Sequence, residues 1–78
     1  MQSIDSLLSA RDRAVLVAVD AGRCDLVAPG SDLRVDGLWF CDQPRAHALV
    51  AAGLLAAGPG RGTAPARLTS AGRAALAA

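Results

Sequence analysis

Hydrophobic residues near the start of the chain recur with the spacing of an amphipathic helix. The apolar face consists of Ala14, Val15, Ala18 and Val19 and is widened by Leu16 and Val17. Ser9 followed three positions later by a carboxylate resembles a capping box. Gly22 suits the left-handed residue that follows a helix end. The pattern therefore predicts a helix over residues 10–21.

The next segment, residues 23–42, has the character of strands and turns. Residues 24–27 form a strand candidate, and the turn signal Ala-Pro-Gly-Ser at 28–31 ends it. Residues 33–35 alternate apolar and charged, Asp36-Gly37 favours a tight turn, and residues 38–41 continue with aromatics. We expect a hairpin around Asp36-Gly37. The alternative is a short helical turn over 32–36 with Ser31 as its cap.

The second half of the chain predicts a helix, a hairpin and a final helix. Asp42 or Gln43 caps the first of these helices, and Pro44 lies in its first turn. Residues 55–57 and 66–68 are expected to be strands on either side of an exposed Gly/Pro-rich tip at 58–62. Thr69 caps a last helix over 70–77. The expected core face of the middle helix is Ala46, Leu49, Val50 and Gly53.

The distribution of charge adds to this picture, because the two halves of the chain carry net charges of opposite sign. All acids are Asp and all bases are Arg, in a chain of 78 residues with a net charge of +1. Residues 1–42 hold seven Asp and four Arg, whereas residues 43–78 hold four Arg and no acid. A basic surface without intervening acids attracts phosphate even when the net charge is small. The other interpretation is a set of solvated surface arginines enriched by coding bias.

The residues from the middle helix onward resemble a known family. The helix ending Ala52-Gly53-Leu54, the Gly- and Arg-bearing loop, and the segment 66–76 (ARLTSAGRAAL) are similar to the end of winged-helix regulators of the MarR and PadR type. The resemblance implies that the helix beginning near Gln43 is a recognition helix and that 58–62 is a wing. It implies an α+β winged-helix-like domain spanning 1–78, in the order helix, β-hairpin, helix, wing β-hairpin, helix. The second helix of the family's motif is atypical or missing between Gly22 and Asp42.

This resemblance and the charge pattern predict a small DNA-binding transcriptional regulator of bacterial or phage type. Arg61 lies between glycines at the tip, as a wing arginine would that reaches phosphate or the minor groove. Helix N-termini favour phosphate, and Gln and Arg can contact base edges. The expected DNA-binding residues are Gln43, Arg45, His47, Arg61 and Arg67. A homodimer or a protein partner would supply further contacts.

The alternative is a protein–protein interaction module that modulates a larger enzyme or transcription factor without binding DNA. The missing brace helix and the Asp-rich N-terminal half favour this alternative. Trp39 and Phe40 are expected to pack in the core; the alternative, since neighbours on a strand point to opposite faces, is that one of them is exposed. The contact surface of such a module would be Leu38 and Trp39.

Other functions find little support in the residues. The chain has one His and no Glu, Lys or Tyr, and it carries no nucleophile elbow, phosphate loop or metal signature. We therefore expect no enzyme, no cofactor, no metal, no small-molecule substrate and no membrane association, in a cytoplasmic protein. Cys24 and Cys41 are expected to be buried apolar side chains. A redox-sensitive disulfide between them is the lesser alternative.

Overall fold

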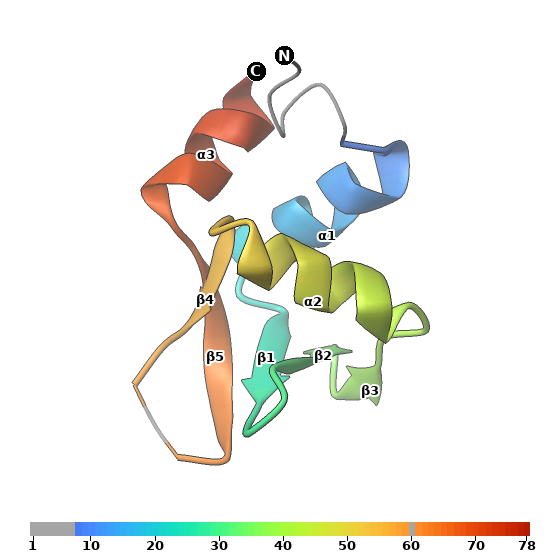
Figure 1. Cartoon of the computed structure of the whole chain (residues 1–78), viewed down its shortest axis with the longest axis vertical. Coiled ribbons are helices and arrows are strands. Elements are labelled where there is room, and N and C mark those ends of the chain that lie inside the picture. The colour runs from blue at the N-terminus through green and yellow to red at the C-terminus, as the bar shows by residue number, and fades with distance from the viewer. Residues whose placement is uncertain (1–7, 60) are drawn as a thin grey trace.

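A computed structural model describes residues 8–59 and 61–78 (Figure 1). These residues form a small α+β fold of three helices and one five-stranded antiparallel sheet. The elements are α1 (Ala10–Asp20), β1 (Cys24–Val27), β2 (Asp32–Val35), β3 (Leu38–Trp39), α2 (Gln43–Ala51), β4 (Leu55–Ala57), β5 (Thr63–Leu68) and α3 (Ser70–Ala77).

The sheet has the strand order β3-β2-β1-β5-β4, so the hairpin that follows α2 closes onto the first strand of the chain. Leu26 lies opposite Leu33 on one side and Ala64 on the other. Strand β3 is one edge of the sheet and β4 is the other. The two edges therefore come from different hairpins, one before α2 and one after it (Figure 1).

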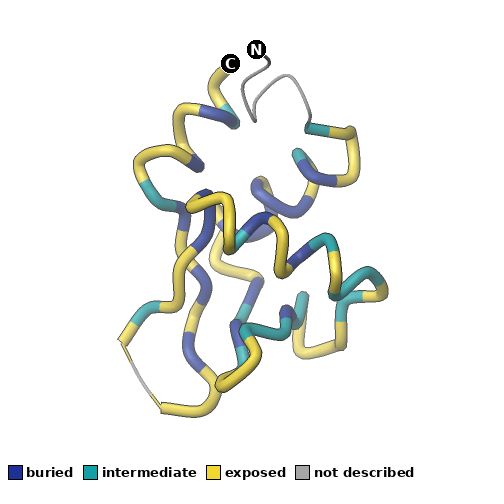
Figure 2. Tube along the Cα trace, viewed as in Figure 1, coloured by how far each residue is buried: buried dark blue, intermediate teal, exposed yellow. Residues whose placement is uncertain are grey.

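The three helices cover one face of this sheet and leave the other face open. Alternate residues of β1 and β5 are buried, as expected when one face packs on a core. Figure 2 shows the buried segments gathered where helices and sheet meet. Leu8, at the edge of the described residues, packs against this core, whereas Leu7 lies outside them. The largest fully buried apolar side chains are Leu16, Leu33, Leu49, Leu54 and Leu55.

Local signals explain where several elements begin and end. The capping box at Ser9 and Asp12 is present in both directions, and Gly22 follows α1 with a φ of 78°. Asp36 and Gly37 both have positive φ, 53° and 80°, which is the conformation of a tight hairpin turn. The hairpin prediction is therefore confirmed, and the alternative of a helical turn over 32–36 is wrong.

Some finer expectations need correction. Val17 was expected to widen the buried face of α1 but is 53% exposed, because only one side of this helix meets the sheet. Gly53 lies beyond the end of α2, is exposed, and takes a left-handed φ of 79° rather than packing in the core. Strand β5 begins at Thr63 rather than at 66, because it pairs with β1 as well as with β4.

Candidate nucleic-acid interface

The N-terminus of α2, the expected phosphate and base contact, is occupied by the protein's own side chains. Asp42 caps the helix and accepts a hydrogen bond from the backbone N–H of Arg45. Arg11 approaches the same carboxylate at 3.7 Å. A carboxylate at this position already takes the place that a phosphate would have at the helix N-terminus. The start of α2 is therefore closed to an anion.

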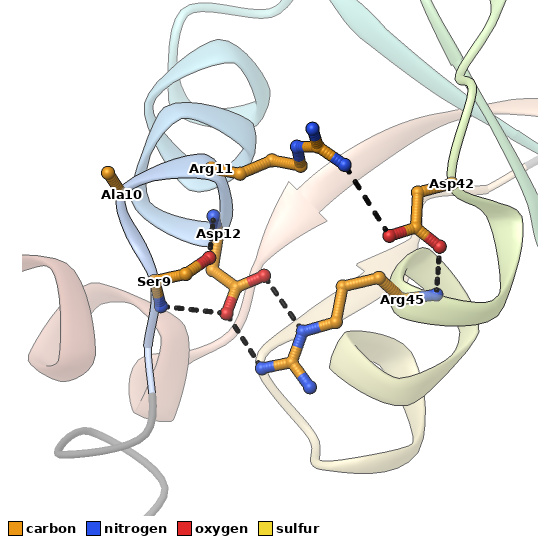
Figure 3. Close-up of a pocket in the computed structure, with 6 residues that line it drawn as sticks. All are labelled: Ser9, Ala10, Arg11, Asp12, Asp42 and Arg45. Carbon is orange, nitrogen blue, oxygen red and sulfur yellow. Dashed lines mark hydrogen bonds and ion pairs between the residues drawn. The ribbon is translucent and has the colours of Figure 1, made fainter.

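Arg45 is bound to α1 through two parallel hydrogen bonds (Figure 3). Its Nε and Nη2 donate to the carboxylate oxygens of Asp12 at 2.8 and 2.7 Å. The side chain of Asp12 is only 1% exposed and also accepts from the backbone of Ser9. The hydrogen bond from Arg45 lowers the pKa of Asp12 from 3.8 to about 2, although burial opposes this shift. Arg45 thus joins α2 to α1.

Gln43 holds α2 to the β2–β3 hairpin. Its Oε1 accepts from the backbone N–H of Leu33 at 2.7 Å, and its Nε2 donates to the carbonyl oxygens of Leu33 and Phe40 at 2.8 and 3.0 Å. The amide therefore satisfies the Leu33 N–H and the Phe40 carbonyl at the point where β3 has ended, and it shares the Leu33 carbonyl with the Phe40 N–H. All three hydrogen bonds are internal to the domain.

Replacing Gln43 by Ala should lower the free energy of unfolding by about 2 kcal/mol, because the Leu33 N–H and the Phe40 carbonyl lose their partner, whereas the Leu33 carbonyl keeps the Phe40 N–H. His47→Ala is the matched control on the same helix. The His47 Nε2 lies 2.7 Å from Asp32 Oδ1, but both side chains are 44% exposed, so we expect less than about 1 kcal/mol. Urea unfolding followed by circular dichroism measures both. Equal losses would contradict the role assigned to Gln43.

The remaining candidates, Arg61 and Arg67, lie on the β4–β5 hairpin and point to solvent. Arg61 stands in the exposed tip between β4 and β5. Arg67 is exposed on β5, opposite Ala56 of β4. Gly58 lies beside it: a side-chain carbon there would come within 3.0 Å of the Arg67 Nε and 3.2 Å of the Pro65 ring. The hairpin therefore carries two outward cations, one of them packed along its surface.

These two arginines differ from most others in having no acidic partner among residues 8–59 and 61–78. Four arginines are paired with carboxylates of α1, the first hairpin or the α2 cap, as in Arg23–Asp36 at 2.7 Å. The Arg23 hydrogen bond lowers the pKa of Asp36, and Asp36 raises that of Arg23. The Asp-rich half of the sequence is thus largely neutralised within the fold. The four paired arginines are Arg11, Arg23, Arg45 and Arg73.

The alternative surface, Leu38 and Trp39, is also exposed. Their exposed fractions are 73% and 62%, and they form the edge strand β3. Phe40 instead packs against the core, so the expectation that both aromatics are core residues holds for Phe40 and is wrong for Trp39. Sequence reasoning missed Arg34, whose guanidinium carbon lies 5.7 Å from the centroid of the Trp39 ring. The signal was available in the alternation of 33–35, which places Arg34 on the face opposite the core.

The cysteines are both free thiols, and only Cys24 is buried. Burial raises the pKa of the Cys24 thiol. The expectation that Cys41 is buried is wrong, because β3 ends at Trp39 and Cys41 follows it into solvent.

Within the described part of the chain, no three His, Cys or Asp side chains gather as they would around a metal ion. None of the described helices has the length and apolar character needed to span a membrane.

Comparison with known proteins returns no match: no family model, no curated protein and no solved structure is similar to this chain.

Proposed function

We propose that this protein binds double-stranded DNA through the β4–β5 hairpin, as a small winged-helix-like regulator. The observation that carries the proposal is the pair of exposed arginines on that hairpin, Arg61 and Arg67, which have no carboxylate within ion-pair distance among the described residues. Unpaired arginines keep their full attraction for phosphate, whereas paired ones would first have to leave their partners.

The position of α2 supports the same proposal in a modified form. The helix ends at Ala51 and the chain passes directly into β4, so α2 and the hairpin are consecutive elements (Figure 1). The solvent side of α2 carries small side chains, among them Pro44, Ala48 and Ala51. The same side also carries His47, which is paired with Asp32, so this face can approach DNA closely but supplies no unpaired arginine. The hairpin would therefore provide most of the affinity through phosphate contacts, with Gln43 and Arg45 holding the helix in place.

Fluorescence anisotropy with a labelled random duplex tests this proposal. Arg61→Ala and Arg67→Ala should each weaken binding several-fold, and each should reduce the slope of log affinity against log salt by about 0.9, because one phosphate contact is lost. The salt slope matters because it counts released counterions and so reports directly on phosphate contacts.

Arg23→Ala is the matched control for both variants. It removes the same formal charge from an exposed site, but Arg23 is already paired with Asp36 at 2.7 Å. Its loss should leave the salt slope unchanged. If Arg23→Ala weakened binding as much as Arg61→Ala, the hairpin would not be the contact. Absence of duplex binding at low salt would overturn the proposal as a whole.

A protein–protein interaction module remains the second candidate, favoured by the exposure of Leu38 and Trp39 on one edge strand. Large exposed apolar side chains on both faces of an edge strand of a small domain are candidates for a contact surface. In this alternative Leu38 and Trp39 together would contact the partner, and Arg61 would have no role.

A further inference from the structure

The open face of the sheet carries a row of side chains that runs across four strands. Trp39 of β3 lies opposite Arg34 of β2, Arg34 lies opposite Asp25 of β1, and Asp25 lies opposite Pro65 of β5. Residues opposite each other in neighbouring strands point to the same face. With strands about 4.8 Å apart, the row spans roughly 14 Å. Arg67 follows two residues beyond Pro65 and so lies on the same face.

The first two members of the row form an aromatic–guanidinium pair. The Arg34 guanidinium lies over the Trp39 ring at 5.7 Å, and Trp39 is nevertheless 62% exposed. Arg34 has no carboxylate within ion-pair distance among the described residues, and its Nε is buried without a hydrogen-bond partner. The guanidinium therefore lies beside the ring, and its outer nitrogens have no hydrogen-bond partner among the described residues.

We propose that this open sheet face, from Trp39 and Arg34 to Arg67, binds single-stranded nucleic acid. An exposed indole gives an unpaired base a surface on which to stack, whatever its sequence. Arg34 beside it and Arg67 farther along the face place cations where the phosphates of such a strand would run. Duplex DNA cannot use the indole in this way because its bases are already stacked.

This inference goes beyond the proposed duplex binding and does not rest on it. Duplex contact is assigned to the β4–β5 hairpin, whereas the stacking site on β3 lies at the opposite edge of the sheet. Arg67 contributes to both sites. Arg61 belongs to the duplex contact alone, whereas Arg34 and Trp39 belong to the single-strand site alone. Variants at these unshared positions therefore separate the two.

Asp25 makes the inference more specific. It lies between Arg34 and Pro65 on the same row, where its carboxylate repels a passing phosphate. Asp25→Asn should therefore bind a single strand more tightly than the wild type, by about twofold or more. A gain on removing an acid is not expected if the face packs against a neutral protein surface.

Quenching of Trp39 fluorescence provides the test, since the chain has one Trp and no Tyr. The wild-type protein is titrated with a 12-nucleotide oligo(dT), an oligo(U) of the same length and a random duplex. We expect both single strands to quench the emission and the duplex to quench it much less. The ratio of the two single-strand affinities decides between DNA and RNA as the natural source.

Leu38→Ala is the matched control, because Leu38 lies opposite Val35 on the other face of the same strand. Arg34→Ala should weaken oligo(dT) binding about fivefold or more, and Leu38→Ala should leave it unchanged. Anisotropy with labelled oligo(dT) extends the test to Trp39→Ala, for which a loss of about tenfold or more is expected. Circular dichroism confirms that each variant is folded.

Three results would overturn the inference. The first is no quenching by either single strand at low salt, and the second is equal quenching by the duplex. The third is equal loss of oligo(dT) binding in Leu38→Ala and Arg34→Ala, which would show that binding does not depend on the face that carries Arg34. Duplex binding that depends on Arg61 could survive all three, so the failure of this inference is distinguishable from failure of the proposed function.

Discussion

Replacing Gly72 by Ala should destabilise the protein by about 3 kcal/mol and lower its melting temperature by roughly 15 °C. Helix propensity alone predicts the opposite, a gain of about 1 kcal/mol. Packing decides the sign, because a side-chain carbon at Gly72 would overlap the backbone carbonyl of Leu54. The same carbonyl accepts a hydrogen bond from the Thr69 N–H at 3.1 Å, so it cannot move away without breaking the start of α3.

Ala71→Gly is the control for this substitution, since Ala71 is exposed on the same helix. It should cost only about 1 kcal/mol through loss of helix propensity. Thermal unfolding followed by circular dichroism ranks the two variants. A Gly72→Ala protein as stable as the wild type would show that the first turn of α3 does not lie in close contact with Leu54.

The Leu-Thr-x-x-Gly segment therefore has a physical explanation that does not depend on family. Thr69 caps α3 through its hydroxyl, which accepts from the Gly72 N–H and donates to the Gly53 carbonyl. Gly72 then allows the first turn of α3 to lie against Leu54, the residue directly before β4. The segment fixes where the last helix meets the chain between α2 and β4. It supports a packing arrangement and says nothing by itself about a ligand.

Most elements were predictable because their signals are local. The cap at Ser9, the Asp36-Gly37 turn, Pro44 in the first turn of α2 and Thr69 before α3 each depend on residues a few positions apart. Local patterns cannot show that β5 joins β1 as well as β4, which depends on residues nearly 40 positions apart. The open face of the sheet follows from that pairing, and so it too was absent from the sequence analysis.

The candidate site was harder to predict because side-chain partners come from distant parts of the chain. Residue type and helix position favour Gln43 and Arg45 as DNA contacts, and both turn out to hold α2 in place. Asp12 was recognised only as a cap, although it also pairs with a residue 33 positions away. Charge counted by sequence half was misleading for the same reason. Ion pairing within the fold, rather than composition, determines which arginines remain available.

The Asp12–Arg45 pair should make the protein sensitive to acid between pH 4 and pH 2. The pKa of Asp12 is about 2 in the folded protein, below its ordinary value of 3.8. The ionised carboxylate therefore stabilises the fold above pH 4, and this contribution disappears as the pH falls through 2. Below pH 2 the carboxyl group is protonated in both the folded and the unfolded protein, so it no longer favours the fold. The free energy of unfolding has then fallen by about 2 kcal/mol.

Asp12→Asn isolates this contribution, because the amide oxygen can still accept from the Ser9 N–H while the charge is removed. We expect it to be about 2–3 kcal/mol less stable at pH 6, less than for a fully buried pair, since the Arg45 side chain is 35% exposed and regains water. Its stability should also fall less steeply than that of the wild type below pH 4. Asp36, whose pKa is also lowered, titrates in both proteins and cancels in the difference. Urea unfolding at a series of pH values measures both curves, and parallel curves would show that folding does not lower the pKa of Asp12.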